Sequence, residues 1–387
     1  MKKTLLTICL TWMCFSLSAQ KIIDLSGKWS FSIDRQDNGE KEKWFSHTLN
    51  DCINLPGSMP EKLKGDEVTA KTQWTGSLYD SSYYYNPYME KYRKEGNIKF
   101  PFFLTPDKHY VGAAWYQKEV NIPADWKGER ILLFLERPHI ETTVWVNGQK
   151  TGMQNSLCVP HQYDITRYVR PGKCTITIRV DNRIKEINVG PDSHSITDQT
   201  QGNWNGIVGR ICLQTTPKTY FDDIQIYPEP EQKLARVKVV IKGAGITKIK
   251  LSAESFNTDK KHIVPAIQQE IKLNKGVTET EMVLPMGNDM LLWDEFHPAL
   301  YKLKAEVTNG KKTEIKEIQF GMRRFEIKGK WFYVNGRKTQ LRGTVENCDF
   351  PLTGYAPMDV ESWERVFRIC RSYGLNHMRF HSFCPPE

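Results

Sequence analysis

Polar side chains follow two predicted strands near the end of the sequence. Glu346, Asn347 and Asp349 come after the segment KTQLRGTV. Arg379 lies near the end of the segment LNHMRF, and His381 directly follows that segment. Carboxylate, amide, guanidinium and imidazole groups bind polar ligands through hydrogen bonds. These five residues are candidate ligand contacts if the two strands form neighbours in one sheet.

The segment between the two strands predicts the helix that a parallel pair requires. Asp359 is a suitable N-cap, and Gly374 stands where a left-handed C-cap is needed. Apolar residues fall on one face of this helix, namely Trp363, Val366, Phe367 and Cys370. Strand, helix and strand within about 45 residues form a βαβ unit, which belongs to a parallel sheet. Because parallel sheets need several strands and cover on both faces, we expect the chain to end inside a third domain.

The sequence before residue 335 predicts β-strands. Alternation is clear in CTITIRVDN, where Ile176, Ile178 and Val180 share one face. The pairs Asn147-Gly148 and Asn335-Gly336 lie between β-rich segments and suit two-residue hairpins, since both positions need positive φ. Short strands with frequent turn signals indicate β-sandwiches. The predicted fold class is therefore mainly β.

Composition and targeting signals narrow the class of partner. The 387 residues carry a net charge of +9, but Lys and Arg are dispersed, so we expect no nucleic-acid partner. Lys2 and Lys3 precede an apolar stretch that ends at Leu17, and Ser18-Ala19 offers a small-residue cleavage site. We therefore expect residues 1–19 to be a signal peptide and the mature protein to be secreted or periplasmic. No later stretch approaches the length of about 18 apolar residues that a membrane span needs, so we expect no membrane insertion.

Cysteine usage indicates neither a disulfide framework nor a metal site. The cysteines after residue 19 are Cys52, Cys158, Cys174, Cys212, Cys348, Cys370 and Cys384. An odd and scattered set argues against a disulfide framework in an exported protein. A Cys-x-x-Cys spacing is missing from the sequence, so we expect no metal and no cofactor.

The stretches VWVNGQKTG, GNWNGIVGRICL, LLWDEFHPALYKL and FGMRRFEIKGKWFYVNGRKTQLRGT follow one another along the chain. Together they are similar, in the same order, to glycoside hydrolase family 2, which includes β-galactosidases, β-glucuronidases and β-mannosidases. The sugar-binding jelly roll of that family is matched by DLSGKWSFSID, VWVNGQKTG, VPHQYDITRYVRPGKCTITIRVDN and GNWNGIVGRICL. Its immunoglobulin-like sandwich is matched by LLWDEFHPALYKL, and its passage into a (β/α)8 barrel by FGMRRFEIKGKWFYVNGRKTQLRGT. The resemblance implies a jelly-roll sugar-binding β-sandwich at residues 20–218 and an immunoglobulin-like β-sandwich at residues 219–320. It also implies that residues 321–387 are the first βαβ of a truncated (β/α)8 barrel.

The resemblance further implies a retaining exo-glycosidase of β-galactosidase type, which hydrolyses O-glycosidic bonds. Retaining enzymes use two carboxyl groups roughly 5 Å apart. In the family both are glutamates at the ends of barrel strands four and seven, whereas this chain contains only what resembles strands one and two. We therefore expect the catalytic glutamates to lie beyond this chain, and the fragment alone to be inactive. Homo-oligomerisation of the full-length protein stays open.

Barrel active sites lie at the C-terminal ends of the strands, which favours substrate contacts for the polar residues at the two strand ends. Family members show Asn-x-x-Arg followed by His and Pro after the second strand. Asn376 and Arg379 match this pattern, whereas His381 comes one place early. Arg379 would brace the nucleophile or a sugar hydroxyl; alternatively, it pairs with a buried carboxylate of the barrel. Glu346 and Asp349 are weaker candidates, because acids in loops are commonly only solvated.

The jelly-roll segment adds four candidate substrate contacts. Trp74 and Tyr79 belong to an aromatic-rich insert at residues 72–110, and aromatic faces pack on the C–H groups of sugars. The alternative for these rings is that they cover the sandwich. Asn203 and Asn205 lie in a polar loop and can each donate and accept hydrogen bonds, which suits recognition of hydroxyl groups.

Two classes of function follow, and both predict a carbohydrate partner. One is an exported family 2 glycosidase, of which this chain is the N-terminal part. The other is a non-catalytic carbohydrate-binding or scaffolding protein made of two β-sandwiches. The reading frame downstream of codon 387 discriminates between them.

Overall fold

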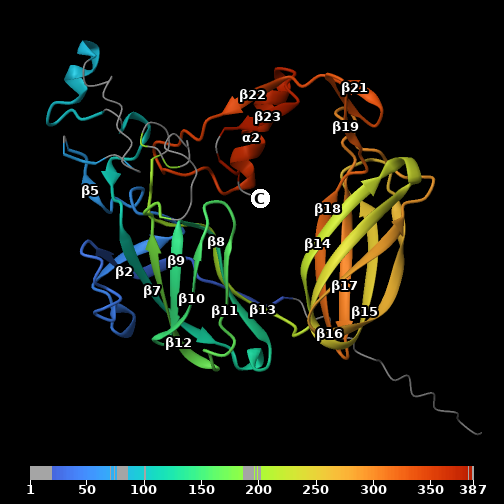
Figure 1. Ribbon diagram of the computed structural model, residues 1–387, viewed down its shortest axis with the longest axis horizontal. Coiled ribbons are helices and arrows are strands. Elements are labelled where there is room, and N and C mark those ends of the chain that lie inside the picture. Colours follow the sequence, from blue (N-terminus) through green and yellow to red (C-terminus); the bar gives the residue numbers. More distant parts are fainter. Residues whose placement is uncertain are drawn as a thin grey trace, which may run out of the picture. The chain divides into compact units, whose positions relative to one another are not determined.

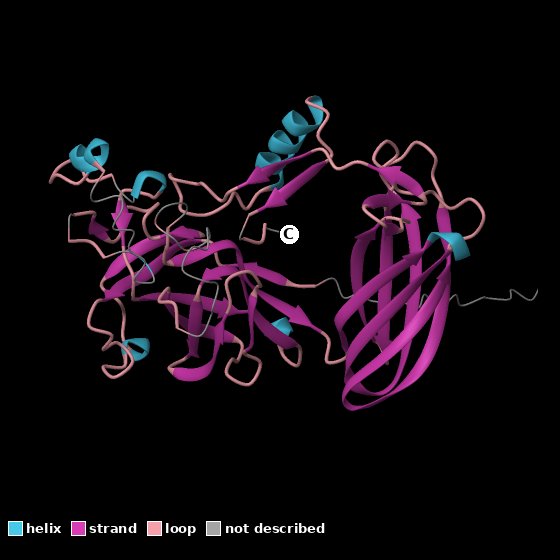
Figure 2. Ribbon diagram, turned by 45° about the horizontal axis from the view of Figure 1, so that its top comes forward, coloured by secondary structure: helices cyan, strands magenta, loops and turns pink. Residues whose placement is uncertain are grey.

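The computed structural model describes residues 20–69, 71–73, 75, 86–99, 102–185, 196, 198, 202–381 and 383–385. The protein is mainly β, as predicted (Figures 1 and 2). It divides into two compact units, of which the first joins Lys21–Thr215 to Gln340–Glu387 and the second contains Thr216–Thr339. The predicted signal peptide at residues 1–19 lies outside the described residues. No described helix is long and apolar enough to cross a membrane.

The first unit is a β-sandwich of two antiparallel sheets. One sheet has the order β1-β13-β8-β11 with β4 beside β13, and the other has the order β10-β9-β12-β7-β2-β3. The strands of the first sheet are β1 (Ile22–Asp24), β4 (Gly57–Ser58), β8 (Arg130–His139), β11 (His161–Asp164) and β13 (Gly206–Thr216). Those of the second are β2 (Gly27–Asp34), β3 (Asp51–Leu55), β7 (Ala113–Ile122), β9 (Glu141–Val146), β10 (Gln149–Asn155) and β12 (Gly172–Asp181). A separate pair joins β5 (Asp66–Glu67) to β6 (Lys108–His109).

The two sheets enclose one hydrophobic core. Trp29, Tyr116 and Ile176 come from the second sheet and contact a cluster that includes Leu133 and Leu213 from the first. Burial of each such side chain stabilises the fold by about 1.5–3 kcal/mol relative to exposure. The predicted inward face of β12 is confirmed, because its apolar residues are fully buried.

The opposite face of β12 is also covered, although its side chains are polar. Thr177, Arg179 and Asp181 alternate with the apolar residues and are themselves buried. Trp115, Trp145 and Leu49 form a smaller apolar cluster on this side of the sheet. A strand that reads as half-exposed is therefore buried on both faces, and its polar face requires partners.

The second unit contains a five-stranded sheet whose longest strands change partner along their length. Its strands are β14 (Tyr220–Glu229), β15 (Leu234–Ser255), β16 (Ile263–Pro285), β17 (Tyr301–Asn309) and β18 (Lys312–Phe320). The first half of β15 pairs with β14, and its second half pairs with β17. A small sheet of β19 (Phe325–Lys328), β20 (Trp331–Val334) and β21 (Arg337–Thr339) belongs to the same unit. The segment that groups with the first unit therefore begins at Gln340, later than the predicted domain start at residue 321.

Both predicted hairpins are confirmed. Asn147 and Gly148 have φ values of 50° and 78° and connect β9 to β10. Asn335 and Gly336 have φ values of 49° and 75° and connect β20 to β21. Positive φ at both positions is the conformation that this dipeptide tolerates best.

The C-terminal segment forms the predicted βαβ unit. Strand β22 (Gly343–Glu346) pairs in parallel with β23 (His377–Phe380), and helix α2 (Val360–Ser372) connects them. The side chain of Asp359 accepts a hydrogen bond of 2.7 Å from the Ser362 amide, which confirms the predicted N-cap. Phe367 is 46% exposed on this helix. That the β22–α2–β23 unit continues into a full barrel stays a prediction.

Short 3-10 helices complete the described elements. They are η1 (Trp44–Ser46), η3 (Pro87–Tyr92), η4 (Phe102–Leu104), η5 (Ala124–Trp126) and η6 (Pro230–Gln232).

Candidate functional site

The structure brings the predicted polar residues together at the C-terminal edge of β22 and β23. The His381 amide donates a hydrogen bond of 2.8 Å to the carbonyl of Glu346, so the two residues lie side by side. The Glu346 carboxylate accepts a hydrogen bond of 2.9 Å from the Cys348 amide, which orients that carboxylate back toward its own turn. Asn347, Asp349 and Arg379 are exposed. Their predicted contacts with a substrate stay predictions.

Asn205 has a structural role in place of the predicted sugar contact. Its side chain is completely buried. The amide nitrogen donates hydrogen bonds of 3.0 Å to the carbonyls of Gly112 and Val180, and the amide oxygen accepts one of 2.8 Å from the Tyr116 hydroxyl. Both amide hydrogens are used inside the sandwich, so none is left for a sugar hydroxyl.

Asn203 is buried and also fastens main-chain segments. Its amide nitrogen donates a hydrogen bond of 2.6 Å to the carbonyl of Asn182, and its amide oxygen lies 3.1 Å from Nε2 of His139. Burial lowers the pKa of His139 to about 3, so the ring is neutral at neutral pH and Nε2–H donates to Asn203. Asn203 nevertheless lines a wide groove, whereas Trp74 and Tyr79 lie outside the described residues.

This groove belongs to the first unit and has a volume of about 680 Å³. It lies between the end of β2, the β5–β6 pair and the start of β7. Its lining includes Asp37, Asp66, Gln73, His109, Tyr110, Arg183 and Asn203. Ligand pockets typically have volumes of about 300–1,000 Å³. The groove can therefore hold a small carbohydrate, with carboxylate, guanidinium and amide groups along its walls.

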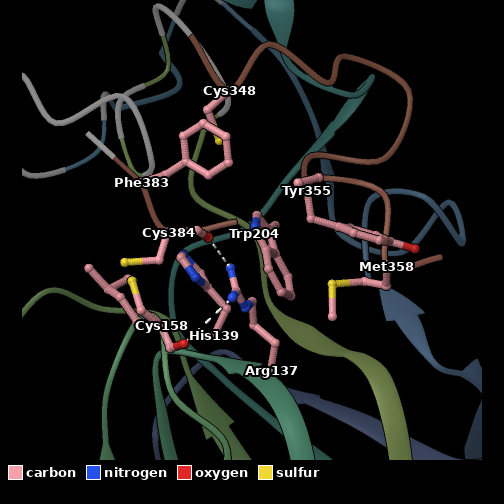
Figure 3. A pocket seen from close by; sticks show the side chains of 11 residues that line it. Arg137, His139, Cys158, Trp204, Cys348, Tyr355, Met358, Phe383 and Cys384 are labelled. Carbon is pink, nitrogen blue, oxygen red and sulfur yellow. Dashed lines mark hydrogen bonds between the residues drawn. The ribbon is translucent and has the colours of Figure 1, made fainter. Parts of the chain in front are cut away.

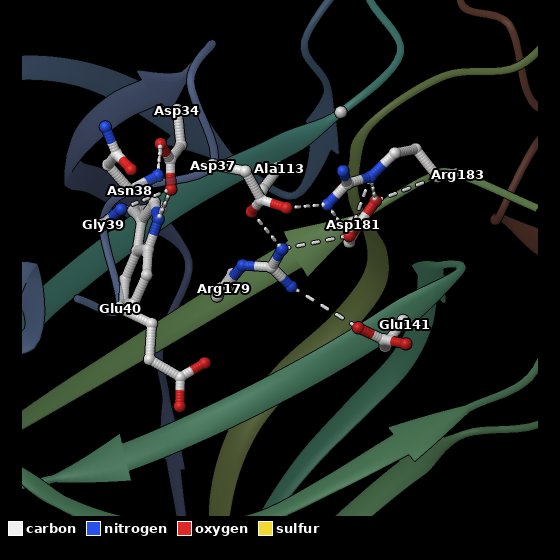
Figure 4. Close-up of polar contacts among 12 residues, drawn as sticks. Asp34, Asp37, Asn38, Gly39, Glu40, Ala113, Glu141, Arg179, Asp181 and Arg183 are labelled. Atoms are coloured by element: carbon white, nitrogen blue, oxygen red, sulfur yellow. Dashed lines mark hydrogen bonds and ion pairs between the residues drawn. The ribbon is translucent and has the colours of Figure 1, made fainter. Parts of the chain in front are cut away.

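A charge network fixes one wall of the groove (Figure 4). The buried Arg179 guanidinium contacts Asp37 at 2.7 Å, Asp181 at 3.0 Å and Glu141 at 3.4 Å. Arg183 also pairs with both aspartates, at 2.6 Å each. These contacts give the buried polar side chains Arg179 and Asp181 of β12 ion-pair partners. They also hold Asp37 and Arg183, which line the groove, in fixed positions.

The network keeps Asp37 and Asp181 ionised. Burial acts to raise the pKa of Asp37, but hydrogen bonds from Arg179 and Arg183 outweigh it and hold that pKa below its ordinary value. For Asp181, burial is likewise outweighed by hydrogen bonds from Arg183 and Lys185, and the pKa is well below its usual range. The groove wall is therefore charged at neutral pH. Asp37 and Arg183 could not be recognised from the sequence, since neither lies in a diagnostic spacing.

The C-terminal segment, which begins at Gln340, packs against the β-sandwich of the first unit (Figure 3). The Ser58 hydroxyl donates a hydrogen bond of 2.6 Å to the Thr353 carbonyl, and the Tyr355 hydroxyl donates one of 2.9 Å to Glu61. The Tyr355 ring lies 5.5 Å from that of Trp204. A hollow of only about 30 Å³ remains at this junction, which is too small for a sugar. The junction therefore positions the βαβ unit on the sandwich and is not itself a ligand pocket.

Among the described residues, no group of three or more His, Cys, Asp and Glu side chains is arranged to hold a metal ion.

Family models match two successive parts of the chain. The sugar binding domain of glycosyl hydrolases family 2 matches residues 22–217, and a second family 2 model matches residues 219–323. A β-galactosidase of Thermoanaerobacter pseudethanolicus is 25% identical over 301 residues, which cover 73% of this chain and 38% of that protein. The human β-glucuronidase is 23% identical over 394 residues, which cover 92% of this chain and 53% of that protein. The chain thus spans about half the length, or less, of these relatives.

Solved structures show a similar fold. A family 2 member from Bacteroides cellulosilyticus DSM 14838 matches with a TM-score of 0.66 at 21% identity, covering 95% of this chain and 45% of that one. A β-glucuronidase from Bacteroides uniformis matches with a TM-score of 0.66 at 18% identity, covering 95% of this chain and 40% of that one. At identities of 21% and 18%, these two matches show a similar fold.

Proposed function

Because the chain belongs to family 2 of the glycosyl hydrolases, we propose that it is the N-terminal part of an exported retaining exo-glycosidase of β-galactosidase type. The observation that carries the proposal is the order of its parts. The two family models cover residues 22–217 and 219–323, and a parallel β22–α2–β23 unit with polar residues at its C-terminal edge follows them. That edge is where barrel enzymes bind their substrates.

In this proposal the chain binds and orients the sugar, and residues beyond it perform the bond cleavage. Two carboxyl groups about 5 Å apart would act as acid/base and nucleophile, and both would lie after residue 387. Arg379 and His381 would contact the sugar or the nucleophile from the end of β23. Glu346 and Asp349 would border the same pocket from the turn after β22.

The test compares the 387-residue chain with the product of the complete reading frame. Both are purified and assayed on nitrophenyl β-galactosides, β-glucuronides and β-mannosides. We expect turnover of one of these by the longer protein, with retention of the anomeric configuration by NMR, and no turnover by the 387-residue chain. A reading frame that stops at codon 387, or turnover by the short chain, would overturn the proposal.

Arg379 can be tested within the longer protein. We expect Arg379→Ala to reduce kcat/KM by about 100-fold or more, because an interaction made in the transition state is lost. Arg371→Ala is the matched control, since Arg371 is exposed in the last turn of α2. Equal activity of the two variants would remove Arg379 from the site.

Export is a separate part of the proposal. Expression with the native N-terminus should yield a periplasmic or secreted protein whose first residue is near Gln20, which N-terminal sequencing would determine. Recovery of the protein in the cytoplasm with Met1 intact would contradict it.

A non-catalytic carbohydrate-binding protein is the second candidate, and the 680 Å³ polar groove favours it. Arg35 and Gln73 line the groove and are exposed, so alanine can replace them without disturbing the core. If the 387-residue chain binds a polysaccharide in affinity electrophoresis, Arg35→Ala with Gln73→Ala should weaken binding. Lys173→Ala, on exposed β12 surface, should leave it unchanged.

A further inference from the structure

Two cysteines from distant parts of the chain meet where the C-terminal segment contacts the sandwich. Cys158 lies between β10 and β11, and Cys384 follows β23. Both line the small hollow of the junction, and their side chains are in hydrogen-bonding contact. Figure 3 shows the two sulfur atoms next to one another. Cys384 is exposed and Cys158 is half-buried, so a small reagent in solution can reach the pair.

Arg137 holds the two main chains together independently of the sulfur atoms. Its guanidinium donates a hydrogen bond of 2.7 Å to the carbonyl of Cys384 and one of 3.1 Å to that of Pro385. The same group lies 3.5 Å from the carbonyl of Cys158. One side chain therefore fixes both cysteine backbones, and the thiols meet without any large movement of the chain.

We propose that Cys158 and Cys384 form a reversible disulfide that fastens the βαβ unit to the sugar-binding sandwich. The oxidant is a small-molecule disulfide of the glutathione type. The Cys384 thiol loses its proton and its sulfur attacks the disulfide, which releases one glutathione thiolate and leaves a mixed disulfide. The Cys158 sulfur then attacks the Cys384 sulfur and releases the second glutathione. Two protein thiols are oxidised, one glutathione disulfide is reduced, and the two protons end on the two glutathione thiols.

The environments of the thiols give this order of reaction. Burial and the hydrogen bond with Cys384 raise the pKa of Cys158, so that this thiol is slow to attack a reagent from solution. Its attack on a mixed disulfide already held beside it is favoured by proximity. Cys384 is the exposed member and reacts first.

Cys348 is the nearest competitor for Cys158. It lines the same hollow, but it is fully buried, and burial raises its pKa far above the ordinary value. Its access to an oxidant and its thiolate fraction are both low. Cys52 on β3 and Cys370 on α2 belong to other surfaces of the first unit. The pairing of Cys158 with Cys384 is therefore specific.

The disulfide would restrict separation of the C-terminal segment from the sandwich at the junction. Without it, the segment after β23 is held by hydrogen bonds from Arg137 to main-chain carbonyls. With it, residues 158 and 384 are joined covalently, and local opening of the C-terminal segment is restricted. Oxidation would thus favour the docked arrangement of the βαβ unit, and reduction would release it.

The experiment uses the purified 387-residue chain, so it does not depend on export or on glycosidase activity. The chain is incubated with glutathione disulfide or with dithiothreitol, remaining thiols are alkylated, and peptides are mapped by mass spectrometry. We expect a loss of about 2 Da per oxidised chain, from two hydrogens, and a cross-linked peptide pair that contains Cys158 and Cys384. Cys384→Ser should abolish this pair, and the matched control Cys52→Ser should retain it.

A second readout follows the docking itself. Proteolysis between residues 347 and 385 should slow by about tenfold or more in the oxidised chain, because cleavage follows the population of the open state. The proposal is overturned by any of three results. These are a linkage of Cys158 to Cys348 or Cys370, a stable glutathione adduct on Cys384 without closure, and recovery of all thiols reduced.

Discussion

Replacement of Asn205 by alanine tests whether this residue belongs to the sandwich or to a sugar-binding loop. The amide of Asn205 connects three groups inside the first unit: the carbonyls of Gly112 and Val180 and the hydroxyl of Tyr116. All three bonds are buried, and Asn205 itself has no exposed surface. Asn205→Ala would remove one buried hydrogen bond from each of two carbonyls and one hydroxyl, although the Gly112 carbonyl keeps a 3.5 Å hydrogen bond from the Asn182 amide.

The expected loss of stability is large. A buried polar group that loses its partner costs about 1–3 kcal/mol. We take about 1–1.5 kcal/mol for each of the three groups, since a water can enter the space that the amide leaves. The free energy of unfolding of the first unit should then fall by about 3–4.5 kcal/mol, which is a large part of the ordinary stability of a domain. Tyr116→Phe removes one of the three bonds and should cost about 1 kcal/mol.

Hydrogen exchange of peptides from β7 and β12 in increasing urea measures this change, because it reports on the first unit separately from the second. Asn121→Ala is the control: Asn121 lies on β7 with an exposed side chain, and its replacement should change stability by less than about 0.5 kcal/mol. A loss below about 1 kcal/mol for Asn205→Ala would refute the structural role. If that variant instead lost only carbohydrate binding, the sugar contact predicted from the sequence would be correct.

Three further predictions concern a glycine, two buried histidines and a helix cap. Gly206 has φ of 150°, and a Cβ there would lie 2.5 Å from the carbonyl oxygen of Gly57, so Gly206→Ala should destabilise the first unit by about 2 kcal/mol or more in urea unfolding. Gly128→Ala, where a Cβ meets nothing within 4 Å, should cost only its backbone strain, about 1 kcal/mol. Burial lowers the pKa values of His139 and His161 to about 3 and about 4, so the unfolded state binds more protons and stability falls as pH decreases below about 6.5. Between pH 4.5 and 6, His139→Phe should reduce the slope of unfolding free energy against pH by nearly one proton, up to about 1.4 kcal/mol per pH unit, and an unchanged slope would contradict the buried neutral ring. Asp359→Ala should raise hydrogen exchange in the first turn of α2 by about fivefold through loss of the cap, and unchanged exchange there would contradict the capping role.

Features that depend on neighbours in the sequence were predicted correctly. Asn147-Gly148 and Asn335-Gly336 lie in hairpins because the dipeptide itself prefers positive φ. Asp359 caps α2 because its carboxylate reaches an amide three residues away. The parallel pairing of β22 with β23 follows from the helix between them, which leaves the second strand few other arrangements.

Features that depend on distant partners could not be predicted in the same way. The carbonyl of Gly112 is 93 residues from Asn205, and no local pattern indicates that it takes up an amide hydrogen. Arg179 reads as the solvent-facing member of an alternating strand, yet Asp37, 142 residues away, covers it. An amide or guanidinium group suits a sugar and a buried network equally well, so residue type alone cannot assign its role.

The first unit is built from two stretches of chain that are separated by the whole of the second unit. The hydrogen bond from Ser58 to Thr353 joins residues 295 positions apart. During synthesis, the sandwich can fold once Thr216 has left the ribosome, but Thr353 follows about 140 residues later. At about 5–20 residues per second, this delay is about 7–28 s. For that time the docking surface around Ser58, Glu61 and Trp204 has no partner from its own chain, and a chaperone or a second nascent chain can occupy it first.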